Sequence, residues 1–122
     1  PIEHFDWLTG GVVLTDGHTF SAAMSNAVQF KQLLNARVIG EPTGGDPNAY
    51  SENYNFELPN SKRKLSLSIR YYPFIEQQTD ALYPDIHVSP SWQEYEEGVD
   101  AVLLKALEML NSSNKKNQYS YQ

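Results

Sequence analysis

The stretch from Val12 to Asp46, VVLTDGHTFSAAMSNAVQFKQLLNARVIGEPTGGD, decides the fold. It begins with a continuous apolar run at Val12–Leu14, which is typical of a buried parallel strand. After a polar turn, Thr19 is predicted as the N-cap of a helix that ends near Asn35. A second short strand is predicted at Arg37–Ile39. The stretch therefore predicts a strand–helix–strand unit with a right-handed crossover.

The second half of the chain predicts a β-hairpin and a helix. From Tyr50 onward, apolar and polar residues alternate on both sides of a turn at Pro59–Ser61, which predicts a hairpin with one buried face. Ser91–Glu94 fits a capping box, and a helix is predicted to run through Gly98, with close packing there, to about Leu110. The predicted core positions are Ala23, Ala27, Phe30 and Leu34, then Tyr54, Phe56, Leu58, Leu65, Leu67, Ile69 and Tyr71, then Tyr95, Val99, Val102, Ala106 and Leu110.

Composition narrows the class of protein. The 122 residues suffice for one domain with one core, and the net charge of −6 argues against nucleic acid or anionic membrane as the main partner. No apolar run is long enough for a transmembrane helix, and the lack of cysteine excludes disulfides, thiol catalysis and cysteine-bound zinc. Pro1–His4 is neither a start methionine nor a signal peptide, so we expect a processed product or a fragment. Residues 111–122 are polar and are expected to form a disordered tail.

Ser21 is the first candidate for chemistry, because it lies between the end of a strand and the start of a helix. The free N–H groups and the positive end of a helix favour an anion there, and the backbone N–H of Ala22 is a candidate oxyanion donor. A serine nucleophile also needs a general base. The alternative is that Ser21 is an ordinary helix-start residue, and position alone does not decide between the two.

Other polar groups give weaker signals. His4, His18 and His87 fit no metal-binding spacing, although His18 precedes Ser21 by three residues and is a candidate base. A surface turn is the alternative role for His18. The glycine-rich loop 40–45 lacks the lysine of a phosphate loop and fits a tight turn. No cofactor or metal site is predicted, and we interpret three carboxylates as a solvated face at a helix start: Glu94, Glu96 and Glu97.

Four segments in order carry a resemblance to a known family. They are Val12–Thr15 with Thr19–Ala23, Val38–Gly45, Tyr83–Ile86 and Asp100–Leu103, and they span most of residues 12–110. The first is similar to the nucleophile segment of the C-terminal processing peptidases, also called tail-specific proteases. The second resembles the family's G-E-x-T-x-G segment, the third its V-x-P-D piece and the fourth its closing helix.

The resemblance implies a hydrolase, a serine-type endopeptidase with an α/β, Clp-protease/crotonase-like β-α-β core, here partial, with a β-hairpin and a C-terminal helix. Ser21 falls on the nucleophile position and Ala22 on the backbone oxyanion donor. The family's lysine base position holds Asp46. Either another base serves, as a histidine with a carboxylate does in the related tricorn-type branch, or the domain is a catalytically inactive homologue that binds peptides. An assembly module, in which Ser21 only begins a helix, is a third hypothesis.

The family's D-L-R-x-N-x-G-G segment, which supplies a second oxyanion donor, is absent from these 122 residues. Residues 1–110 are therefore expected to be the C-terminal part of a catalytic domain, inactive without the upstream part of that domain. The expected partners are that upstream part and a peptide or protein substrate, and not nucleic acid. The resemblance points to an extracytoplasmic location, in the cell envelope or secreted.

Overall fold

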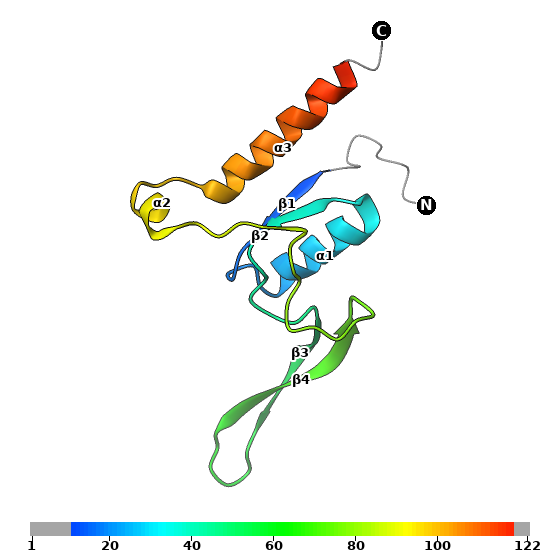
Figure 1. The fold of residues 1–122 in the computed structure, drawn as a ribbon. Helices are drawn as coiled ribbons and strands as arrows, with labels where there is room; N and C mark the ends of the chain where they lie inside the picture. The colour runs from blue at the N-terminus through cyan, green and yellow to red at the C-terminus, as the bar shows by residue number, and fades with distance from the viewer. Residues whose placement is uncertain (1–10, 119–122) are drawn as a thin grey trace.

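The computed structural model describes residues 11–118 and shows a small parallel sheet, two helices packed on it and a projecting hairpin (Figure 1). The elements are β1 (Val12–Thr15), α1 (Ala22–Leu34), β2 (Arg37–Gly40), β3 (Asn48–Glu57), β4 (Lys64–Pro73), β5 (Ile86–His87), α2 (Trp92–Glu96) and α3 (Ala101–Gln118). The predicted α/β class is confirmed. Across the described residues, no helix has both the length and the apolar character that crossing a bilayer requires.

The parallel sheet has the strand order β1-β2-β5. Val13 pairs with Val38, and Ile39 pairs with Ile86, so β2 is the central strand. Val38 and Ile39 are both 0% exposed, because helices contact β2 from both sides (Figure 1). The strand–helix–strand prediction is confirmed. β1, however, has only one neighbour in the described chain, and Leu14, predicted to be buried, is 40% exposed at that edge.

Helix α1 packs on the sheet through a stripe that shares Ala27 with the predicted one but is otherwise different. Met24, Ala27 and Val28 are buried, and the last two form the core with Val38 and Leu82. The spacing 24, 27 and 28 is that of one helix face. The predicted positions Ala23 and Phe30 are instead exposed, because they lie outside this face. The burial predicted for Ala27 is confirmed, whereas that predicted for Ala23 and Phe30 is wrong.

The hairpin prediction is confirmed, but its buried face is not. β3 and β4 are antiparallel, with Tyr50 opposite Tyr71 and Tyr54 opposite Leu67. The hairpin projects away from the sheet (Figure 1), and the residues of its two strands that were predicted to be buried are 38 to 60% exposed. Alternation shows that side chains share a face, but it does not show that another element covers that face.

The predicted C-terminal helix is two helices. The capping box at Ser91 is present, with its hydroxyl accepting from the Glu94 N–H, but α2 ends at Glu96. Gly98 adopts φ 69° just after the helix, in the left-handed region where glycine commonly ends helices, and a Cβ there would meet no atom within 4 Å. The close packing predicted at Gly98 is therefore wrong.

Helix α3 then begins at Ala101, where the Asp100 carboxylate accepts the Leu103 N–H at 2.8 Å. Of the predicted core positions in this region, Ala106 is buried, whereas Tyr95 and Leu110 are exposed. α3 continues to Gln118, and residues 119–122 lie outside the described chain. The disordered tail expected from residue 111 stays a prediction.

Candidate active site

Ser21 occupies a strained backbone position immediately before α1. Its φ is 53° and its ψ is −120°. The Ala23 N–H donates to the Phe20 carbonyl at 3.2 Å, so Ser21 lies at the second position of a tight turn that leads straight into the helix. A non-glycine residue with such a backbone costs about 1–3 kcal/mol, and residues of this kind cluster at active sites and ligand-binding positions. The predicted N-cap Thr19 is wrong, because Ser21 itself occupies that position.

The Ser21 side chain is available for chemistry. It is exposed and makes no capping hydrogen bond, although capping is the usual role of a serine at a helix start. The next residue, Ala22, is the first of the helix, and its N–H donates to no acceptor in the part of the chain that the structure describes. A free hydroxyl and a free N–H therefore lie side by side at the positive end of α1.

A groove of about 510 Å³ opens in front of Ser21. It lies between the start of α1, the loop before β3 and the base of the hairpin. The side chains and backbone that line it belong to Phe20, Ser21, Ala22, Met24, Ser25, Asp46, Pro47, Ala49, Tyr50, Ser51, Glu52, Asn53, Ser68, Tyr72 and Phe74. The structure thus brings three of the predicted site residues to one groove: Ser21, Ala22 and Asp46.

One carboxylate oxygen of Asp46 accepts a hydrogen bond, and the other accepts none within the described residues. Its Oδ1 accepts the Asn48 N–H at 2.7 Å, and its Oδ2 has no partner among residues 11–118. Asn48 is buried and anchors this loop, since its amide donates to the Gln77 carbonyl and accepts the Ile75 N–H. The Asp46 carboxylate is consequently held in a defined orientation on the wall of the groove.

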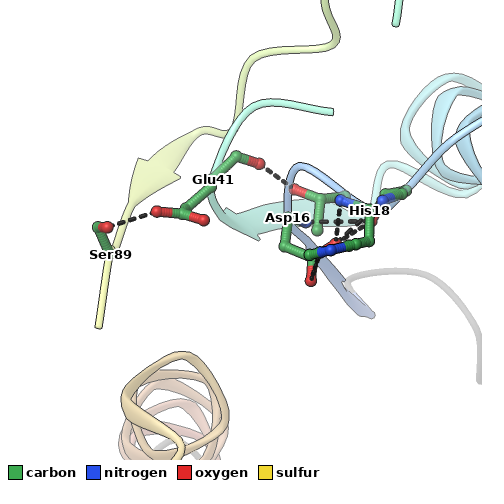
Figure 2. A network of polar contacts seen from close by, with 6 residues as sticks. Asp16, His18, Glu41 and Ser89 are labelled. Carbon is green, nitrogen blue, oxygen red and sulfur yellow. Dashed lines mark hydrogen bonds and ion pairs between the residues drawn. The ribbon is translucent and has the colours of Figure 1, made fainter. Parts of the chain in front are cut away.

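His18, the predicted candidate base, lies outside the groove. Its side chain is 98% exposed, and its Nδ1 is 3.6 Å from an oxygen of Asp16 in the turn after β1 (Figure 2). Burial opposes the charge on Asp16, but the Thr19 hydroxyl and the His18 and Thr19 N–H groups outweigh it and lower the pKa of this carboxyl.

His87 is an exposed residue of β5, and His4 lies outside the described residues.

The glycine-rich loop after β2 supports the turn that presents Ser21. The Gly44 N–H donates to the Thr19 carbonyl at 3.1 Å, and a Cβ on Gly44 would overlap the Gly17 carbonyl oxygen. A Cβ on Gly45 would lie 2.8 Å from the Phe20 ring. On the same loop, the Glu41 carbonyl accepts the Thr15 hydroxyl, and its carboxylate accepts the Ser89 hydroxyl (Figure 2). Gly44 is therefore needed for close packing against the turn that precedes Ser21, whereas Gly45 packs against the exposed Phe20 ring.

Thr43 joins this loop to the segment before β5. It is 5% exposed, and its hydroxyl accepts the Leu82 N–H at 2.9 Å and donates to the Gly45 carbonyl at 3.2 Å. Thr43→Val leaves the buried Leu82 N–H without a partner, so we expect it to lower the free energy of unfolding by about 1–3 kcal/mol. Urea unfolding measures this, with Thr43→Ser as the control that keeps the hydroxyl. An unchanged midpoint for Thr43→Val would contradict the role.

Asp85, in the V-x-P-D-like segment, is structural. Its carboxylate accepts Lys31 Nζ at 2.6 Å and the Val38 N–H at 2.9 Å, which ties α1 and β2 to the start of β5. Burial opposes the charged form, but the Lys31 and Val38 hydrogen bonds and the charges of Lys31 and Arg37 outweigh it and lower the pKa of Asp85.

This lowered pKa predicts an acid-sensitive contribution to stability. The stabilisation is fully present above the unfolded pKa of about 3.9 and is lost as the pH falls through the lower folded value. Asp85→Asn should therefore lower the melting temperature at pH 7, and the gap to the wild type should narrow toward pH 3. Thermal unfolding across this range checks it, with the exposed Glu76→Gln as control. A gap that is constant with pH would contradict the prediction.

A second polar cluster, which the sequence did not predict, has Glu52 and Tyr72 in the lining of the groove and Arg70 beside it. The Tyr72 hydroxyl donates to Glu52 Oε1, and Arg70 Nη1 lies 3.3 Å from the same oxygen. Strand alternation alone would put Glu52 on the face of Tyr50, away from Arg70. Glu52 has φ 56°, and this left-handed backbone breaks the alternation. The hydrogen bond to Glu52, followed by burial, raises the pKa of Tyr72.

Comparison with known proteins finds a likeness among solved structures. No protein-family model and no curated relative matches the sequence. Among solved structures that match is one from Parabacteroides merdae ATCC 43184, provisionally described as a peptidase, with 26% identity and a TM-score of 0.57. The match covers 90% of this chain but 34% of that chain, so this chain spans about a third of that protein. The likeness shows a peptidase-like fold.

Proposed function

We propose that the full-length protein is a serine-type endopeptidase of the C-terminal processing, or tail-specific, type, and that it cleaves peptide bonds through Ser21. The observation that carries the proposal is the strained turn at Ser21, which presents an unbonded hydroxyl beside the unbonded Ala22 N–H in an open groove. The peptidase-like fold of the Parabacteroides structure supports it. Residues 1–110 would then be the C-terminal part of the catalytic domain.

The proposed reaction is acyl transfer. The Ser21 oxygen attacks the carbonyl carbon of the substrate and gives its proton to a base, while the developing oxyanion accepts the Ala22 N–H at the positive end of α1. The tetrahedral intermediate collapses, and the leaving amine takes the proton from the base. Water then hydrolyses the serine ester in a second acyl transfer. The second oxyanion donor would come from the upstream part of the domain.

We assign the general base to Asp46. Four titratable side chains of the described residues line the groove, namely Asp46, Tyr50, Glu52 and Tyr72. The two carboxylates are the candidates for a proton acceptor, because a phenol must first lose its own proton. The Tyr72 hydroxyl donates to Glu52 Oε1, and Arg70 pairs with the same oxygen, so the charge of Glu52 is already paired with a cation although its Oε2 is free. Asp46 has no such cation among the described residues. Asp46 keeps a free oxygen and has its orientation fixed by the Asn48 N–H. A positioned carboxylate can take the proton of a nucleophile.

The substrate would bind in extended form beside β3. Within the described chain β3 pairs only with β4, so its other edge has free backbone groups, and residues 49–53 of β3 line the groove. An extended peptide can add to such an edge as a further strand. The groove would then hold the scissile bond in front of Ser21.

A second candidate function is peptide binding without cleavage, which the absence of a lysine at position 46 favours. Quenched-fluorescence peptides incubated with the full-length protein separate the two functions. The peptidase predicts cleavage at a defined bond, identified by mass spectrometry, with a burst of first product when deacylation is slow. Peptide binding with no cleavage would contradict the peptidase and support the binder.

A further inference from the structure

We propose that the Glu52 side of the groove is a subsite for a positively charged substrate side chain, so that the protein prefers peptides with lysine or arginine next to the scissile bond. The inference deepens the proposed function, and only its cleavage readout rests on that function. The inference depends on the position of Glu52 Oε2, a carboxylate oxygen that is free to bind a ligand in the same groove as Ser21.

The Glu52 carboxylate is fixed on one side and open on the other. The Tyr72 hydroxyl and Arg70 Nη1 both approach Oε1, whereas Oε2 has no partner among the described residues. The Arg70 guanidinium also lies over the Tyr72 ring, 5.2 Å from its centre, which holds the three side chains together. A carboxylate oxygen that is oriented in this way can accept a charge-assisted hydrogen bond from an ammonium or guanidinium group.

The charges around the groove favour the same kind of ligand. Two carboxylates line it, those of Asp46 and Glu52, and within the described chain no lysine, arginine or histidine does. Arg70, which does not itself line the groove, offsets the charge of Glu52, so the groove keeps a net charge of one negative unit. A groove lined by groups of one charge attracts a ligand of the opposite charge. An acidic substrate side chain would be repelled.

The backbone conformation of Glu52 places its carboxylate beside Arg70 and Tyr72. Its φ of 56° is unfavourable for a residue with a side chain, and neighbouring pairs of the ladder, Ser51–Arg70 and Asn53–Ser68, keep the regular register on either side. The strain is therefore local to one residue. It directs the Glu52 carboxylate to Arg70 and Tyr72, and strained residues of this kind recur at ligand-binding positions.

The test uses peptides that differ only at one position beside the scissile bond, with lysine, glutamine or glutamate there. We expect kcat/KM for the lysine peptide to exceed that for the glutamine peptide about fivefold, as for a half-exposed ion pair, with the glutamate peptide slowest. Glu52→Gln should remove this preference, Arg70→Gln should increase it, and the exposed control Glu96→Gln should leave it unchanged. High salt should reduce it in the wild type.

Binding gives a second readout that does not need turnover. Fluorescence anisotropy of the labelled lysine and glutamine peptides with the Ser21→Ala protein should show the same order of affinity. If cleavage is absent but lysine is preferred in binding, the proposed chemistry fails and the subsite stands. Equal affinities for the two peptides, or a lysine preference that survives Glu52→Gln, would overturn the subsite.

Discussion

Ser21→Ala in the full-length protein is expected to lower kcat by about 10⁴-fold or more, because it removes the nucleophile and leaves only binding and oxyanion stabilisation. The fold should be unaffected. The Ser21 hydroxyl makes no hydrogen bond in the described chain, so its loss leaves no partner unsatisfied. The measurement is the single-turnover rate of peptide cleavage, with the melting temperature measured in parallel.

Ser25 provides the matched comparison, because it lies one helical turn later and lines the same groove. Its hydroxyl donates to the Ser21 carbonyl at 3.2 Å, so it is already engaged. Ser25→Ala should therefore retain far more cleavage than Ser21→Ala. The reverse order of activities would assign the nucleophile to Ser25 and contradict the account.

The second large effect is expected for Asp46→Asn, which should lower kcat about 10²–10⁴-fold with little change in KM. The amide is nearly the same size and can still accept the Asn48 N–H, so the loop should keep its conformation. What is lost is the capacity to take a proton from Ser21. Steady-state kinetics with the same peptide measure the change.

Retained activity in Asp46→Asn would place the base elsewhere, as in the sequence-based alternative of a histidine. In the described chain His18 is turned to Asp16 in a solvent-exposed position, which makes it a poor source of that base. Such a result would indicate a residue upstream of this chain. It would leave the assignment of Ser21 as the nucleophile intact, because Ser21→Ala and Asp46→Asn are measured independently.

The sequence predicted the elements well where the pattern is local. The apolar run at Val12–Leu14 and the alternation in the hairpin depend on neighbouring residues, so β1, β3 and β4 were found. The burial of the hairpin was wrong because it depends on what another segment covers. Gly98 was placed within one helix because glycine tolerates both a helix interior and the left-handed end of one.

The candidate site was predicted only in part, for similar reasons. The family resemblance pointed to Ser21, Ala22 and Asp46, and the structure brings these to one groove. The left-handed backbone of Ser21 and Glu52 gave no sequence signal, because serine and glutamate rarely adopt it. The pairing of Glu52 with Arg70 and Tyr72 follows from that backbone and from the hairpin register, which only the fold supplies.

The most direct test of the account is the site at which a fluorophosphonate reacts. This reagent phosphonylates an activated serine hydroxyl, and peptide mapping by mass spectrometry identifies the modified residue. We expect a stoichiometric adduct on Ser21 of the full-length protein, blocked by prior incubation with a substrate peptide and absent from Ser21→Ala. An adduct on another serine, or no adduct while peptides are still cleaved, would contradict it.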